Sequence, residues 1–304
     1  MLASPPRLPI LNTVFRRMNE RVSTISPLSV EASLRNVRIG ETPLKGSLDI
    51  DITEKRTGVG VPLAPFIVYV NDVEELEGRC STKGKYTHEL SLIDHRSQVD
   101  VYHSRKRLVE ASDSLEVLWD NFDDNSFDTR NWQMFAGSPG YYVGRSETKE
   151  ANKQLKFIST NTGYLAGACT ETPIDVSNSK IKVKLYSGGW VVCFLSILPS
   201  NTPFYGASYN KGYDVGIWQN GIDKFIIYSE GRMPYRKGTL RGNPETIEVV
   251  VEDDVIRFLE EGFEVYTEAY KPASKLCNIY LWGQSWYHFR GGVSWADDFL
   301  LVGG

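Results

Sequence analysis

Carboxylate side chains are the first residues of this sequence that could do chemistry, because two of them on one face of a strand can act together as acid, base or nucleophile. Glu245, Glu248 and Glu252 are spaced E-x-x-E-x-x-x-E, which distributes them over both faces of an alternating strand. Glu171 and Asp175 share a face, but a proline between them is poorly tolerated inside a strand. The spacing therefore predicts no catalytic residue, although acids from separate strands remain an alternative.

A second acidic group could bind a cation. Asp123, Asp124, Asn125 and Asp128 offer hard oxygen atoms of the kind that Ca²⁺ prefers. Their spacing is not that of an EF-hand loop, and Asp-Asp-Asn-Ser is also an ordinary composition for a polar turn. We expect no organic cofactor, and the sequence leaves a Ca²⁺ site and a plain turn as alternatives.

Aromatic side chains near turns are a third candidate, because the face of a Trp or Tyr ring can stack on the apolar face of a pyranose sugar. With 7 Trp and 16 Tyr in the chain, most of these rings belong in a core, and only the exposed ones can bind. The rings that follow or lie within turns, and that we expect to bind carbohydrate, are Trp190, Tyr205, Trp218, Trp286 and Tyr287.

Composition argues against several other classes of protein. The net charge is −4 and no basic block occurs, which argues against a nucleic-acid partner. No apolar run is long enough to span a membrane, and the first residues lack the apolar core of a signal peptide. The run VVCFLSIL predicts that Cys193 is a buried free thiol, and no cysteine pair has the CxxC spacing of a zinc site.

Short strands must position these side chains. The composition is aromatic, rich in glycine and rich in turns, which predicts an all-β chain. Alternation is clearest at 48–52, where three apolar residues alternate with two acids. We expect one short helix within the first 29 residues. Its apolar face packs on its own domain or docks on a partner or neighbouring subunit through Leu11, Phe15 and Met18.

The predicted organisation is two β-sandwich domains after an N-terminal extension. The extension covers 1–29, a small immunoglobulin-like sandwich covers 30–118, and a larger jelly roll covers 119–304. A sandwich commonly brings its first and last strands together, so we expect the strand near 118–120 to pair with the strand near 295–302.

Two regions resemble known domain families. GVPLAPFIVYV at 60–70, followed by GKY at 84–86, resembles an immunoglobulin-like or carboxypeptidase-regulatory-like module, which implies a spacer or presentation domain. The second region resembles the concanavalin A-like lectin/glucanase (laminin-G-like) superfamily, through FDDNSFDTRNW at 122–132, IEVVVEDDVIRF at 247–258 and WADDFLL at 295–301. That resemblance implies a two-sheet jelly roll, and the superfamily includes glycoside hydrolases.

This layout predicts a non-catalytic adhesion or receptor-binding protein, or a virion structural protein of a phage tail or capsid surface. Its partners would be a cell-surface glycan or polysaccharide and other virion or surface-assembly subunits, and a homo-oligomer is left open. Without a signal peptide, its expected place is the virion or the cell exterior. Two alternatives remain: a polysaccharide-active glycoside hydrolase with dispersed carboxylates, and a purely structural capsid or filament module.

Overall fold

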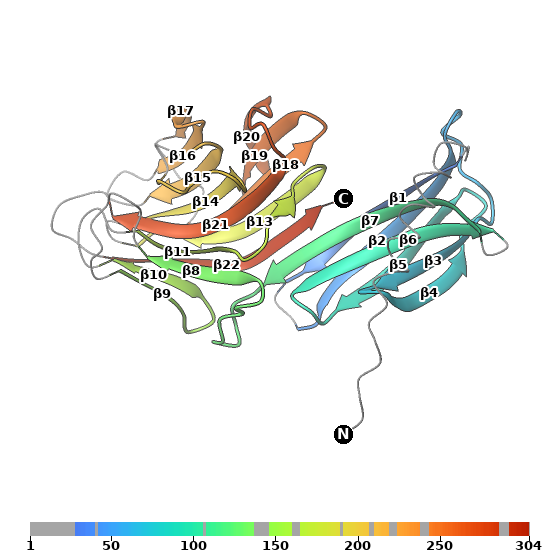
Figure 1. Ribbon diagram of the computed structural model, residues 1–304, viewed down its shortest axis with the longest axis horizontal. Coiled ribbons are helices and arrows are strands. Elements are labelled where there is room, and N and C mark those ends of the chain that lie inside the picture. Colours follow the sequence, from blue (N-terminus) through green and yellow to red (C-terminus); the bar gives the residue numbers. More distant parts are fainter. Residues whose placement is uncertain are drawn as a thin grey trace, which may run out of the picture. The chain divides into compact units, whose positions relative to one another are not determined.

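The computed structural model describes residues 28–39, 42–105, 108–136, 146–159, 165–188, 191–206, 210–218, 224–237, 243–285 and 292–303. Within these residues the chain is all-β, as predicted, and builds several antiparallel sheets (Figure 1). The expected N-terminal helix, with Leu11, Phe15 and Met18, lies outside the described residues. In the described part of the chain, no helix is long and apolar enough to cross a membrane.

The chain divides into two compact units. The first takes Met1–Arg38 and Pro43–Glu116, and the second takes Ile39–Thr42 and Val117–Gly304. The change of unit falls within one long strand, β7 (Leu108–Asp120).

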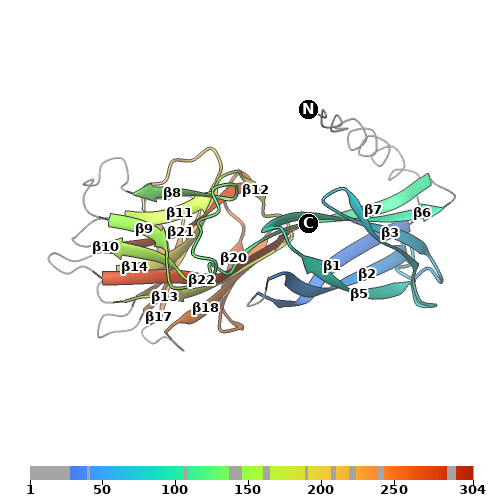
Figure 2. The same cartoon turned by 90° about the horizontal axis from the view of Figure 1, so that it is seen from below.

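The first unit is a small sandwich of two sheets (Figure 2). In β2 the side chains of Leu48, Ile50 and Ile52 are buried, which confirms the predicted alternation. Phe66 of one sheet packs on Tyr86 of the other, with ring centroids 4.8 Å apart. A specifically immunoglobulin-like module stays a prediction. One sheet has the order β1 (Leu28–Arg38), β2 (Leu44–Glu54), β5 (Lys85–Leu92); the other continues from β7 through β6 (Arg96–Arg105) and β3 (Pro65–Val70) to β4 (Val73–Arg79).

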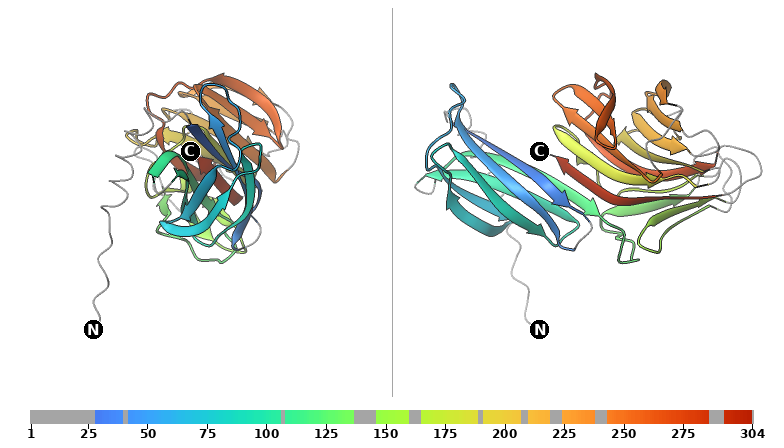
Figure 3. Two further views of the ribbon diagram at one scale, coloured as in Figure 1. Left: turned by 90° about the vertical axis from the view of Figure 1, so that its right-hand side faces the viewer. Right: turned by 180° about the vertical axis from the view of Figure 1, so that it is seen from behind.

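The second unit is a larger sandwich whose two sheets enclose a single apolar core (Figure 3). We call them the β13 sheet and the β14 sheet. The β13 sheet has the order β20 (Phe263–Ala269), β19 (Val255–Glu260), β18 (Glu245–Glu252), β13 (Ser179–Tyr186), β22 (Gly292–Gly303), with β10 (Leu155–Ser159) on β22 and β9 (Ser146–Glu150) on β10. The β14 sheet has the order β17 (Arg232–Lys237), β16 (Lys224–Ser229), β15 (Tyr213–Trp218), β14 (Val191–Pro199), β21 (Leu276–Ser285), β11 (Leu165–Thr170), β8 (Trp132–Ala136), with β12 (Ile174–Asp175) on β21.

The predicted pairing of the terminal strands is confirmed, because β7 and β22 are hydrogen-bonded neighbours. Asp120, at the end of β7, accepts hydrogen bonds from the Phe122 N–H (2.9 Å) and from Trp132 Nε1 (3.0 Å). The Trp132 ring then packs edge-on against Phe299 of β22, at 5.0 Å between centroids. Asp120 therefore fixes the entry of the chain into the core of the second unit.

Both faces of the β14 sheet are covered where β14 crosses it. All nine residues of β14 are buried, including the free thiol of Cys193, as the apolar run predicts. Since side chains of a strand alternate between faces, one face of β14 contributes to the core and the other must be covered from outside. At the end of the same sheet, the edge strand β17 carries exposed Arg232, Pro234 and Arg236.

Candidate functional site

The outer face of the β14 sheet, which is turned away from the β13 sheet, carries a layer of aromatic side chains. Phe194 stacks on Trp282, with centroids 4.6 Å apart and an interplanar angle of 18°. Phe204, from the loop after β14, stacks on Tyr280 at 4.9 Å and 16°. Rings packed in this offset way add binding energy to their burial. The aromatic layer comprises Phe135, Phe194, Phe204, Trp218, Tyr228, Tyr280 and Trp282.

Glycines let these rings lie directly on the sheet. A Cβ atom at Gly216 would come within 2.3 Å of the Phe194 ring, and one at Gly167 within 2.6 Å of the Phe135 ring. Since real Cβ contacts are never that close, both positions need a residue without a side chain. The backbone of β15 and β11 thus forms the floor under the aromatic layer.

Asp214, in β15, lies on this outer face beside the aromatic layer. It is fully buried. Its Oδ1 accepts hydrogen bonds from Ser196 Oγ and from Asn210 Nδ2, the latter at 2.7 Å. Ser196 Oγ in turn accepts a hydrogen bond from Trp282 Nε1 at 2.7 Å. These bonds connect the carboxyl group of β15 to β14, to β21 and to the loop after β14.

Burial disfavours the charged form of Asp214 and raises its pKa to about 7, while the hydrogen bonds from Ser196 and Asn210 lower that pKa again. The other carboxyl oxygen, Oδ2, is buried and has no hydrogen-bond partner among the described residues. Buried polar atoms are nearly always partnered in native proteins, so this unpartnered oxygen is a candidate contact for a ligand group or an ordered water. A group of this kind can hold and donate a proton near neutral pH.

Asn210 joins this carboxyl to the loop. Its Oδ1 accepts the backbone N–H groups of Tyr205 (2.9 Å) and Gly206 (3.1 Å), while its Nδ2 donates to Asp214. Asn210 is itself fully buried. One amide side chain therefore satisfies two backbone donors of the loop and one acceptor of the sheet.

The aromatic residues predicted to bind carbohydrate differ in their exposure to solvent. Tyr205 is 40% exposed, in keeping with the expectation of a surface ring. Trp218 was expected at the surface, but it is only 6% exposed, because it follows Asp214 by four residues on the same face of β15 and packs into the aromatic layer. Trp190, Trp286 and Tyr287 lie outside the described residues.

The predicted cation ligands are engaged in other contacts. Asp128 accepts hydrogen bonds from Arg130 Nε (3.0 Å) and Nη2 (3.1 Å), and Asp123 forms an ion pair with Lys153 at 3.9 Å. The remaining two accept backbone N–H groups; they are Asp124 and Asn125. Across the described ranges, no group of three or more His, Cys, Asp or Glu side chains is placed to hold a metal ion. The Ca²⁺ site stays a prediction.

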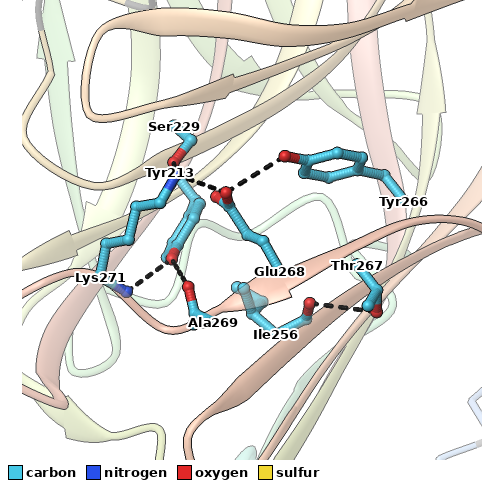
Figure 4. Close-up of polar contacts among 8 residues, drawn as sticks. All are labelled: Tyr213, Ser229, Ile256, Tyr266, Thr267, Glu268, Ala269 and Lys271. Carbon is cyan, nitrogen blue, oxygen red and sulfur yellow. Dashed lines mark hydrogen bonds and ion pairs between the residues drawn. The ribbon is translucent and has the colours of Figure 1, made fainter.

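A second polar cluster lies around Lys271 and connects the two sheets (Figure 4). Lys271 Nζ forms an ion pair with Glu268 and lies 3.3 Å from Ser229 Oγ, and its backbone N–H donates to the hydroxyl of Tyr213 at 2.8 Å. Glu268, in β20, also accepts the hydroxyl of Tyr266 at 3.1 Å. The ammonium group is occupied by Glu268, so the cluster is suited to joining the sheets rather than to activating Ser229.

Sequence reasoning did not single out Asp214, Ser196 or Asn210. One signal was available, because Asp214, Gly216 and Trp218 alternate along one short apolar strand. A carboxyl group, a glycine and an aromatic ring on one face of a strand indicate a surface that can bind a ligand. The contact between Asn210 and Asp214 depends on how the loop turns, which alternation along a strand does not encode.

No protein-family model matches the sequence, and no curated protein matches it. Solved structures similar to this chain include an endo-acting O-glycanase of the human gut microbiota, with 13% identity, a TM-score of 0.47, and coverage of 61% of this chain and 97% of that one. The endo-β-1,3-glucanase of Pyrococcus furiosus has 12% identity, a TM-score of 0.46, and coverage of 62% and 95%. The carbohydrate recognition domain of Emp47p has 11% identity, a TM-score of 0.44, and coverage of 61% and 94%.

These neighbours are jelly-roll domains of the lectin/glucanase type that the sequence resembles. Most of the similar structures are glycoside hydrolases, and others are carbohydrate recognition domains. That distribution contradicts the expectation of a non-catalytic adhesion, receptor-binding or virion protein, and with it the expectation that the chain is not an enzyme. TM-scores below 0.5 assign no activity to this chain, so its function must be argued from its own residues.

Proposed function

We propose that the second unit is a polysaccharide-active glycoside hydrolase whose substrate binds at the outer face of the β14 sheet. Asp214 is the proton donor in this proposal. The observation that carries it is the unpartnered oxygen of a buried carboxyl group beside a layer of aromatic rings. The ring that can stack on a sugar here is Tyr205, which follows Phe204 of this layer and is 40% exposed, whereas Phe194, Trp218 and Trp282 are buried.

General acid catalysis of glycosidic bond cleavage requires a carboxyl group that is protonated at the pH of the reaction. Asp214 fits this role, since burial raises its pKa to about 7. It would give its proton to the glycosidic oxygen as the bond to the anomeric carbon breaks, and water would add to that carbon. The water must lose a proton to a second carboxylate. Only the acid is assigned here.

The test is release of reducing ends from laminarin, mixed-linkage β-glucan and mucin O-glycans by the full chain. Because general acid catalysis contributes about 10²–10⁴-fold, Asp214→Asn should lower kcat by at least about 100-fold. The matched control is Asp254→Asn, since Asp254 is 93% exposed and far from any ring of the aromatic layer in the sequence. Equal rates for Asp214→Asn and the unchanged chain, or no release from any of the three substrates, would overturn the proposal.

A binding measurement separates the role of the Asp214 carboxyl group from that of the aromatic side chains. Affinity electrophoresis in gels containing the same glycans should show that Asp214→Asn still binds, because the aromatic layer is intact. Tyr205→Ala should lose both binding and release, because its ring is 40% exposed.

A further inference from the structure

We propose that Ser196 and Asn210 are positioning residues that place the acid proton of Asp214 on its Oδ2 atom. The directions of the hydrogen bonds around this carboxyl group carry the inference, so it concerns the free protein. The catalytic use of that proton rests on the proposed hydrolysis, whereas its place on the carboxyl group does not.

The hydrogen bonds of Asn210 fix the orientation of its amide. Its Oδ1 accepts the backbone N–H groups of Tyr205 (2.9 Å) and Gly206 (3.1 Å), and a backbone N–H can only donate. The other end of the amide, Nδ2, is a donor, and it gives a hydrogen to Asp214 Oδ1 at 2.7 Å. In the reversed orientation, the two backbone N–H groups would face an NH₂ group and the amide oxygen would face a carboxyl oxygen.

The hydroxyl group of Ser196 is fixed in a similar way. An indole N–H only donates, so Trp282 Nε1 gives its hydrogen to Ser196 Oγ at 2.7 Å. The hydrogen of the hydroxyl group must then go to another acceptor. Among the described contacts of Ser196, that acceptor is Asp214 Oδ1. Ser196, Asp214 and Trp282 are fully buried, so bulk water does not compete for these bonds.

Two donors therefore meet at one carboxyl oxygen. A carboxyl oxygen has two lone pairs, and those of Asp214 Oδ1 accept from Ser196 Oγ and Asn210 Nδ2. A proton on Oδ1 would displace one of these donors, and a buried donor without an acceptor is unfavourable. Oδ2 has no hydrogen-bond partner among the described residues. The proton of the neutral acid therefore belongs on Oδ2, the oxygen that is free to contact a ligand group.

The same two hydrogen bonds also favour the ionised form of Asp214. Burial raises the pKa of this carboxyl group, and the bonds from Ser196 and Asn210 lower it. Tyr228 of β16 lies opposite Asp214 in the strand register. Burial and the charge of Asp214 raise the pKa of Tyr228 to about 12, while Arg236 of β17 lowers it. Tyr228 therefore stays neutral while Asp214 titrates.

The test is a titration of Asp214 in the full chain by carbon-13 NMR, with aspartate labelled at its carboxyl carbon. The signal of Asp214 is the one that Asp214→Asn lacks. Ser196→Ala removes one donor to Oδ1, so the acid dissociation constant of Asp214 should fall about tenfold. Ser196→Thr keeps the hydroxyl group and should restore the constant. The matched control is Ser200→Ala, at an exposed position, which should leave the constant unchanged.

Two further measurements address the second donor and the proton itself. Asn210→Ala removes the donor Nδ2 and should also lower the acid dissociation constant of Asp214, which tests the inference independently of Ser196. Neutron diffraction from deuterated crystals, kept at a pH below the measured pKa of Asp214, should locate a deuterium on Oδ2. A deuterium on Oδ1 would overturn the inference, and so would titrations of Ser196→Ala and Asn210→Ala that match the unchanged chain.

The pH profile of hydrolysis separates positioning from a merely structural role. A general acid must be protonated, so kcat falls as the pH rises through the pKa of Asp214. Ser196→Ala should move this fall to higher pH by about one unit and leave KM unchanged. A structural defect would instead lower kcat equally at every pH. The titration needs no substrate, so a failed hydrolysis assay leaves it standing, and an unchanged titration leaves the role of Asp214 in hydrolysis intact.

Discussion

Asp124 and Glu150 accept hydrogen bonds from the same donor, the backbone N–H of Ser126, at 2.8 Å and 3.1 Å. Two carboxyl groups that share one amide hydrogen lie close together, and the buried Asp120 adds a further negative charge nearby. Burial, followed by a hydrogen bond to Asp124, raises the pKa of Glu150 to about 8. The contact between β9 and the turn after β7 is therefore most favourable when this pair holds a proton.

The first prediction concerns stability against pH. The folded state binds a proton at Glu150 more tightly than the unfolded state, so stability is fully present below about pH 4.5 and falls as the pH rises towards about 8. Glu150→Gln should remove this loss. We expect it to raise the free energy of unfolding at pH 8 by about 1–2 kcal/mol, after allowance for solvent screening.

Urea denaturation at pH 5 and pH 8 measures this effect. The control is Glu147→Gln, because Glu147 lies in the same strand and its side chain is 57% exposed. If Glu150→Gln and Glu147→Gln have the same stability difference between the two pH values, the shared proton has no effect on folding.

A second prediction concerns Ser196, whose hydroxyl lies between Trp282 Nε1 and Asp214. Ser196→Ala leaves a buried indole N–H without its acceptor, which should cost about 1–3 kcal/mol in the free energy of unfolding. Chemical denaturation followed by tryptophan fluorescence measures it. Ser200→Ala, at the exposed position directly after β14, should cost less than about 0.5 kcal/mol. Equal losses in the two variants would mean that the bond to Trp282 is not formed in solution.

The architecture of this chain could be predicted largely from its sequence, because alternation and turns are local properties. The buried side chains of 48–52 and the apolar run around Cys193 are examples. The pairing of β7 with β22 could be anticipated from general sandwich topology. The site could not be predicted, because Asp214, Ser196 and Trp282 meet from three strands separated by long stretches of chain. Trp218 shows the limit most clearly, since only the outer aromatic layer explains its burial.

The third prediction concerns the floor of the aromatic layer. In Gly216→Ala the new methyl group would meet the Phe194 ring, so the ring must leave its place on the backbone. We expect a loss of about 1–3 kcal/mol and a change in the near-ultraviolet circular dichroism of the stacked rings. In Gly262→Ala nothing lies within 4 Å, but φ is +77°, so that control should cost only about 1 kcal/mol and leave the spectrum unchanged. An unchanged spectrum for Gly216→Ala would contradict the packing described.

The fourth prediction concerns the cluster around Lys271. Lys271→Met leaves the carboxylate of Glu268, only 10% exposed, without its cation, and should lower the free energy of unfolding by about 1–3 kcal/mol. The double variant with Glu268→Gln should recover most of this loss, since no charge is then left buried. Lys149→Met breaks an exposed ion pair with Glu147 and should cost less than about 0.5 kcal/mol. A double variant no more stable than Lys271→Met would exclude the ion pair as the cause.

Strand β17 bears on how the protein behaves in concentrated solution. An open sheet edge invites the edge of a second molecule, and aggregates grow when backbone groups on both sides find partners. Pro234 has no N–H to offer at that edge, and the positive charges of Arg232 and Arg236 repel a second copy of the same strand. The sheet that bears the aromatic layer is thereby protected against edge-to-edge aggregation at β17.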